Sequence, residues 1–271
     1  IDSCSEGFAG RFKRNVLSVF FDRFLKLPLF NRNLNWGNEH KNSFYFLWHT
    51  KFAKNLKSHI NVFVTGNPML TNIENNKVKQ GISKAIKLDG FNPQKKTVVI
   101  CTEAFFGTFD EGRLNKIYIN TINALKDYQF IIKVHPRDDE LTYRETFLKP
   151  GIENVIIVKQ VGLKDLFSIS DVQISVNSYS SVEAIIEGLP VILVLNDLIK
   201  TPYHFEETVV LKANDEYELA QRIKEAVSSN YLSVFRNHRN NFLNSIYTFS
   251  NAKDSEIAIK KAFSIIENDR C

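Results

Sequence analysis

A histidine and an arginine end an apolar segment near the middle of the chain, in the stretch "IIKVHPR" (131–137). Pro136 fixes its own φ and favours an extended conformation for His135, so the backbone directs the imidazole. An imidazole can donate a hydrogen bond to phosphate, and the guanidinium of Arg137 can bind it with two parallel N–H groups. The stretch therefore predicts an anion site. The structural alternative is a strand-end histidine and an arginine paired with a neighbouring aspartate.

A hydroxyl-rich turn, "VNSYSSVEAIIEG" (176–188), follows a later apolar segment and opens a predicted helix at Ser180 or Ser181. A helix N-terminus offers unpaired N–H groups and the positive end of a dipole, which suit an anion. The alternative is ordinary capping, with Ser180 as the N-cap and Glu183 completing a capping box. The candidate contacts in this turn are Asn177, Ser178, Ser180, Ser181 and Glu183.

Two adjacent carboxylates, Asp110 and Glu111, precede Gly112 in the loop "TEAFFGTFDEGR" (102–113). A carboxylate at the end of a strand can act as a general base towards a hydroxyl group. The alternative is that one of the two caps the helix predicted to begin near Arg113.

A fourth candidate is the turn formed by Gly66, Asn67 and Pro68, whose alternative is a simple tight turn after a strand. The sequence has no P-loop, no GxGxxG and no GxSxG motif. A hydrolase triad of His135 with one of the serines is therefore disfavoured, because no serine lies in a nucleophile elbow.

Short apolar segments alternate with helical ones from residue 97 onward, which predicts a parallel sheet with both faces covered. The predicted strands are 97–101, 129–134, 154–158, 172–176, 190–195 and 208–212. The predicted helices between them begin near residues 113, 139, 163 and 181. In such a fold ligands bind at the carboxyl ends of the strands, and all four motifs follow a predicted strand, the fourth in the first lobe. We expect strand 172–176 to lie beside strand 129–134, so that the serines and His135 face one phosphate.

The composition is that of a globular protein, with 44% hydrophobic and 24% charged residues among 271. A net charge of +5 favours anionic ligands and is too small to argue for nucleic acid. Three distant cysteines, without CxxC or a nearby histidine, disfavour disulfides and a metal site and favour a reducing cytoplasm. No apolar run is long enough to cross a bilayer. Residues 12–30 predict an amphipathic core helix or, alternatively, a basic helix on the inner face of the membrane.

The stretches "KVHPR" and "SISDVQISVNSYSSVEAIIEGLPVILV" together resemble the nucleotide-binding lobe of two-lobed GT-B glycosyltransferases. The likeness is strongest to bacterial enzymes with CMP- or CDP-activated donors. These include sialyltransferases, polysialyltransferases and CDP-glycerol glycerophosphotransferases. It covers about residues 60–212. The segment "FVTGNPML" (63–70) is more similar to the glycerophosphotransferase and sugar-epimerase groups.

The resemblance implies a Rossmann-like donor lobe at 91–271, after a partial acceptor-side lobe and interlobe segment at 1–90. Because the chain opens with Ile1 and little precedes the boundary, we expect N-terminal residues to be missing. The implied activity is metal-independent transfer of a sugar or sugar-like group to a surface glycan, such as lipopolysaccharide or capsule, with no cofactor.

Carried over from the sialyltransferases, the acidic-acidic-Gly motif is Asp110 to Gly112, and Asp110 is the base. His135-Pro136 binds the CMP phosphate, and Ser180-Ser181 helps to hold it. The implied partners are a nucleotide-sugar donor and a glycan or glycolipid acceptor; the oligomeric state stays open. Two alternatives remain, a non-hydrolysing UDP-sugar 2-epimerase and a non-catalytic nucleotide-binding lobe.

Overall fold

The structure, a computed structural model, describes residues 44–47, 61–66, 88–103, 111–149, 151–176, 178–194, 208–247 and 252–268. The chain divides into two compact units, Ile1–Asn75 with Leu243–Cys271, and Asn76–Phe242. This division differs from the one expected from the sequence, because a C-terminal segment groups with the first unit. The amphipathic segment 12–30 lies outside the described residues.

In the first unit, strand β1 (Phe44–Leu47) pairs in parallel with β2 (Asn61–Val64), and β2 is the strand expected before the turn at Gly66. Gly66 follows β2 with φ of +65°, a left-handed conformation that favours glycine and agrees with the predicted turn. Helix α9 (Ala252–Asn268) packs against β2.

The second unit is built on a six-stranded parallel sheet, as the alternating pattern predicts. Its strands are β3 (Lys96–Cys101), β4 (Tyr128–Lys133), β5 (Val155–Val158), β6 (Val172–Ser175), β7 (Val191–Val194) and β8 (Val210–Ala213). Runs of valine and isoleucine favour extended backbone and fill the centre of the sheet, where the strand residues 98–100 and 130–132 are at most 1% exposed. Each strand begins and ends within two residues of its predicted limits.

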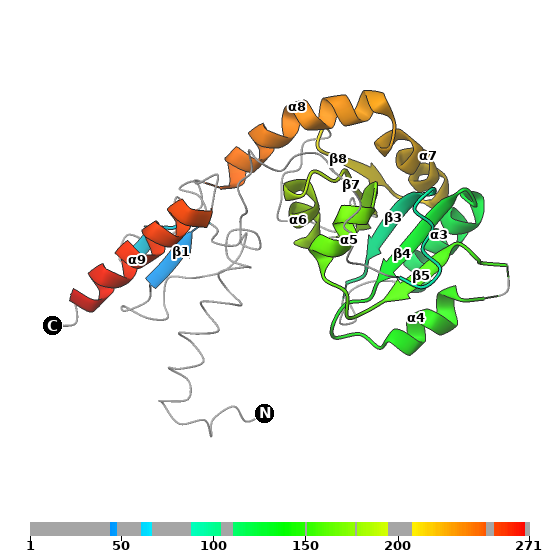
Figure 1. The fold of residues 1–271 in the computed structure, drawn as a ribbon, viewed down its shortest axis with the longest axis horizontal. Helices are drawn as coiled ribbons and strands as arrows, with labels where there is room; N and C mark the ends of the chain where they lie inside the picture. The colour runs from blue at the N-terminus through cyan, green and yellow to red at the C-terminus, as the bar shows by residue number, and fades with distance from the viewer. Residues whose placement is uncertain are drawn as a thin grey trace, which may run out of the picture. The chain divides into compact units, whose positions relative to one another are not determined.

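Helices cover both faces of this sheet (Figure 1). They are α3 (Glu111–Ala124), α4 (Glu140–Phe147), α5 (Leu163–Ile169), α6 (Ser180–Ile186) and α7 (Glu216–Ala226). Helix α8 (Ser229–Ile246) follows α7, and its residues up to Phe242 belong to this unit. Helix α3 packs on α7, and α5 packs on α6; Figure 1 shows the two pairs on opposite sides of the sheet. None of the described helices is long and apolar enough to cross a membrane.

The strand order is β5-β4-β3-β6-β7-β8, the doubly wound order of the Rossmann fold. Strand β3 therefore lies between β4 and β6, and the expectation that β6 lies beside β4 is wrong. Right-handed crossovers on opposite faces carry the chain away from β3 in both directions, so β3 becomes the centre. The carboxyl ends of β3 and β6 flank the topological switch point, where such sheets bind ligands.

Candidate functional site

The two residues that follow β3 tie together the loops on either side of the switch point. Thr102 accepts a hydrogen bond through Oγ1 from the backbone N–H of His135, at 2.8 Å. Glu103 accepts one through Oε1 from the backbone N–H of Val176, at 2.9 Å. Thr102 thus fixes the start of the histidine turn, and Glu103 fixes the end of β6. Glu103 was not predicted from the sequence, although an acidic residue two positions after a central strand is a usable signal.

The imidazole of His135 lies half-buried at the carboxyl edge of the sheet, after β4. Its Nδ1 accepts a hydrogen bond from the backbone N–H of Arg137, at 3.1 Å. This bond places the ring proton of the neutral imidazole on Nε2, which makes Nε2–H a donor. Burial lowers the pKa of His135, and the nearby charges of Arg137 and Lys133 lower it further against the opposing effect of Asp138. The side chain is therefore a neutral hydrogen-bond donor at pH 7.

Three cationic side chains surround this histidine turn. Arg137 is exposed, and none of the ion pairs found among the described residues involves it, contrary to the alternative that it pairs with an aspartate. Lys159 donates from Nζ to the backbone carbonyl of Asp138 at 2.7 Å, and Lys133 lies at the end of β4. Asp138 accepts a hydrogen bond from the hydroxyl of Tyr143, at 3.1 Å. The turn therefore carries more positive than negative charge, as an anion site requires.

The serine turn differs from both interpretations of the sequence. The N-cap of α6 is Tyr179, which makes no side-chain capping bond, and Ser180 is the first helical residue. The N–H of Ser180 donates to Oγ of Ser178 at 3.2 Å. The next three N–H groups donate to the carbonyls of Ser178 and Tyr179. The capping box of Ser180 with Glu183 is therefore absent from α6, and its first-turn N–H groups already have acceptors.

The hydroxyls of Ser180 and Ser181 are directed into the protein. Ser181 is 1% exposed, and its Oγ lies 2.6 Å from Oγ of Ser175, at the end of β6. Ser180 is 6% exposed and accepts a hydrogen bond from Nε2 of Gln173 at 3.3 Å. Both hydroxyls join α6 to β6, so Ser178 is the described serine of this turn that remains nearest the surface.

Ser181→Ala should lower the free energy of unfolding by about 1–3 kcal/mol, because Oγ of Ser175 loses its buried partner. The affinity for CMP should stay within about twofold, and both values follow from urea unfolding and titration of the same sample. Ser168→Ala is the matched control, since the bond that its hydroxyl makes among the described residues is to the carbonyl of Asp165 within α5. A tenfold loss of CMP affinity at an unchanged unfolding midpoint would return Ser181 to the anion site.

Glu183 lies half-buried on α6, and burial together with Glu187 raises its pKa to about 7. Its proton is therefore retained by the folded protein at pH values where the unfolded chain, with a carboxyl pKa of 4.5, has released it. Stability must fall as the pH rises between these two values. A protonated carboxyl at this edge of the sheet could donate a hydrogen bond to a ligand near neutral pH.

Glu183→Gln should remove that fall in stability. The variant should match the wild type near pH 5 and exceed it by about 1–3 kcal/mol at pH 8, taking 1.36 kcal/mol per pKa unit. Urea unfolding at both pH values measures the difference. The exposed Glu145→Gln on α4 is the control, and equal pH slopes in wild type and Glu183→Gln would contradict the raised pKa.

The acidic motif is described only in part. Glu111 and Gly112 are the first two residues of α3, and both are exposed. Asp110, Asn177 and Asn67 lie outside the described residues. Gly66 belongs to the other compact unit. The elements that the structure brings to one edge are thus those bearing His135, the serine turn and the start of α3.

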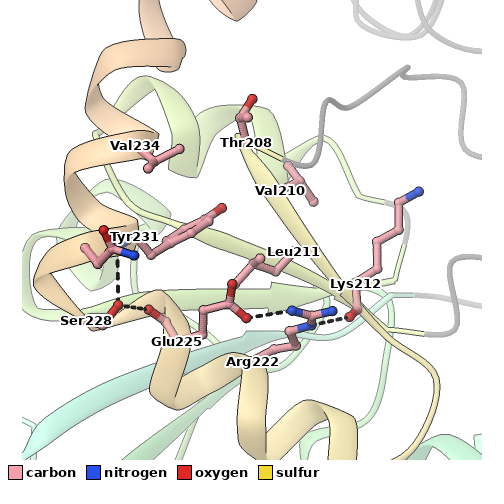
Figure 2. Close-up of a pocket in the computed structure, with 10 residues that line it drawn as sticks. Thr208, Val210, Leu211, Lys212, Arg222, Glu225, Ser228, Tyr231 and Val234 are labelled. Carbon is pink, nitrogen blue, oxygen red and sulfur yellow. Dashed lines mark hydrogen bonds and ion pairs between the residues drawn. The ribbon is translucent and has the colours of Figure 1, made fainter.

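A cavity of about 360 Å³ lies away from this edge, between β8, α7 and α8 (Figure 2). Arg222 spans its floor, donating to the carbonyl of Lys212 at 3.3 Å and pairing with Glu225 at 2.6 Å. The ring of Tyr231 lies across the cavity, and its buried hydroxyl has no hydrogen-bond partner among the described residues. Strand β8 is four strands from β4, so the cavity is separate from the histidine turn. No group of His, Cys, Asp and Glu side chains in the described part of the chain is placed to hold a metal ion.

No protein-family model and no curated protein sequence matches the chain. Several solved structures, in contrast, are similar to this chain. A variant of the wall teichoic acid polymerase TagF soaked with CDPG has 15% identity and a TM-score of 0.51, over 84% of this chain and 59% of that one. The calicheamicin glycosyltransferase CalG4 has 14% identity and a TM-score of 0.50, over 96% and 65%. A UDP-N-acetylglucosamine 2-epimerase has 15% identity and a TM-score of 0.50, over 78% and 53%.

These likenesses define the fold of the chain. The predicted class, an α/β protein with a Rossmann-like parallel sheet of the GT-B type, is confirmed by the sheet order and by glycosyltransferase neighbours. The chain spans 53 to 65% of the length of the three solved chains.

Proposed function

We propose that this chain is part of a metal-independent glycosyltransferase whose donor is a CMP- or CDP-activated sugar or sugar-like group. Its acceptor is a hydroxyl of a surface glycan or glycolipid. One observation carries the proposal. A neutral His135, with its proton on Nε2, lies among cationic side chains at the carboxyl edge of a doubly wound sheet.

The chemistry follows from the charge that develops on the leaving group. An acceptor oxygen forms a bond to the sugar carbon while the bond from that carbon to the phosphate oxygen breaks. The departing nucleotide then carries an extra negative charge, which preorganised donors and cations stabilise. Nε2–H of His135 donates to the phosphate, and Arg137 adds a guanidinium. Asp110 accepts the proton of the acceptor hydroxyl.

The role of Asp110 has a consequence for donor binding. Asp110→Asn should leave CMP affinity within about twofold while transfer is lost, since a general base acts on the acceptor. Isothermal titration of the variant with CMP measures the first part. A loss of affinity of tenfold or more would place Asp110 at the donor instead, and the unfolding midpoint shows whether it caps α3.

The choice of a cytidine nucleotide is supported by the motif resemblance and by the likeness to a polymerase whose structure was soaked with CDPG. The likeness to a UDP-N-acetylglucosamine 2-epimerase favours a second candidate, an epimerase-like enzyme that binds a uridine nucleotide. The two candidate functions differ in the nucleotide base that the protein should bind, cytosine or uracil.

A thermal-shift panel of CMP, CDP, UDP and GDP tests the proposal. A nucleotide present at 100 times its Kd stabilises the folded state by about 2.7 kcal/mol. For a chain of this size that shift in Tm is roughly 5–10 °C. CMP or CDP should give the largest shift. A larger shift with UDP would favour the epimerase-like candidate, and no shift with any of the four would refute a nucleotide site.

A further inference from the structure

Lys133 is a charged residue in an apolar place. It is the last residue of β4, and it is only 9% exposed. The last residues of the six strands are Cys101, Lys133, Val158, Ser175, Val194 and Ala213. Only Lys133 among them carries a charge, so a cation is held at the carboxyl edge of the sheet, next to the central strand β3.

The ammonium group of Lys133 has hydrogen-bond partners but no counter-charge among the residues that the structure describes. Nζ donates to the backbone carbonyl of Lys159 at 2.6 Å and to that of Val134 at 3.2 Å. Within the described ranges no carboxylate lies at ion-pair distance from it. Burial lowers the pKa of Lys133, and the neighbours that act on it are Cys101 and Lys159, neither of which is a carboxylate. Buried charges are normally paired, so the ammonium group of Lys133 is suited to binding an anion.

The location of the ammonium group is fixed by its two acceptors. Val134 directly follows β4, and Lys159 directly follows β5, so Nζ lies at the carboxyl edge rather than in the middle of the sheet. The positive charge of Lys133 acts on His135, because it contributes to lowering the pKa of that imidazole. Lys133 and His135 therefore lie two residues apart at the same end of β4, where the chain leaves the sheet.

A purely structural role would make Lys133 a tie between the ends of β4 and β5. That role uses two of the three ammonium N–H groups and leaves the charge without a function. A neutral side chain could supply the same two bonds at a lower desolvation cost. We infer that Lys133 supplies the fixed positive charge that binds the phosphate of the donor nucleotide, beside the neutral donor His135. This inference rests on the proposed function.

The test compares CMP with cytidine, which has the same base and ribose but no phosphate. Lys133→Met keeps the length of the side chain and removes the charge. The Kd for CMP should rise by about tenfold or more, as for the loss of a bond to a charged group, while the Kd for cytidine stays within about twofold. NMR titration measures both constants. Lys96→Met is the matched control, because Lys96 begins β3 at the opposite edge and pairs with Asp171.

Lys133→Gln keeps an N–H donor for the two carbonyls without the charge, and should show the same selective loss for CMP if the Met variant does not fold. Equal affinity for CMP in wild type and either variant would overturn the inference, and so would a parallel loss for CMP and cytidine. The proposed function fails separately, if the wild type does not bind CMP or if His135→Ala binds it as well as the wild type.

Discussion

Replacing His135 with alanine should weaken CMP binding by about 10- to 150-fold and leave the fold intact. A hydrogen bond to a charged group contributes roughly 1.5–3 kcal/mol, and each 1.4 kcal/mol is a factor of ten in Kd. The imidazole is half-buried, and its only described side-chain bond is the one that Nδ1 accepts from Arg137. Removing it therefore costs the fold little. In a transfer assay the same change should slow turnover by about 10²–10³, as for the loss of one oxyanion-type donor.

Two variants separate the donor role of His135 from other effects. His135→Gln places an amide N–H near the position of Nε2, and it should recover part of the affinity that alanine loses. His238→Ala removes a half-buried histidine on α8, away from the anion site, and should leave CMP affinity unchanged. A His135→Ala protein that retains more than half of the wild-type affinity would remove this imidazole from the site.

The sequence was sufficient to locate the elements of the second unit. Each strand is a run of buried valine and isoleucine between polar segments, and that contrast is local, so the predicted limits of the strands agree with the structure. The order of the strands is not local. Whether β6 lies beside β4 or beyond β3 depends on the direction of each crossover, and no residue in these strands encodes it.

The direction in which a serine hydroxyl points could not be predicted from the sequence either. Ser180 and Ser181 begin a helix, where a hydroxyl can face a ligand, cap the helix or turn inward. The inward choice is set by Ser175 and Gln173, which lie on one face of β6 and need buried partners. Their spacing of two within an apolar strand was the available signal, because alternate residues share a face.

The burial of two charged residues, Lys133 and Arg239, was also not predicted from the sequence. Lys133 was part of the quoted motif, yet its type suggested a surface side chain, since lysine is rarely buried. Arg239 lies in a helix that offered no motif at all, and it is 7% exposed. Only the packing of distant elements reveals what such a residue contacts.

Arg239→Met should lower the free energy of unfolding by about 2–6 kcal/mol. The guanidinium of Arg239 on α8 donates from Nε to the carbonyl of Ile185 at 2.5 Å, and from a terminal nitrogen to the carbonyl of Ile186. These are the last residues of α6, and the carbonyl of Ile185 also accepts a hydrogen bond from the N–H of Gly188 at 3.0 Å. Without the guanidinium each carbonyl loses a bond to a charged donor, which contributes about 1.5–3 kcal/mol, less the desolvation cost of the buried charge. The loss is a large part of the 5–15 kcal/mol typical of a folded protein.

Urea unfolding measures this effect as a lower midpoint at an unchanged slope. Arg236→Met removes an exposed arginine one turn earlier on α8, and it should change stability by less than about 0.5 kcal/mol. Arg239→Lys keeps the charge but loses the planar pair of donors, so its stability should fall between those of the wild type and Arg239→Met. The CMP affinity of the folded fraction should stay within about twofold, because Arg239 contacts the end of α6 rather than the histidine turn. An Arg239→Met protein as stable as Arg236→Met would show that the other partners of these carbonyls satisfy them without the guanidinium.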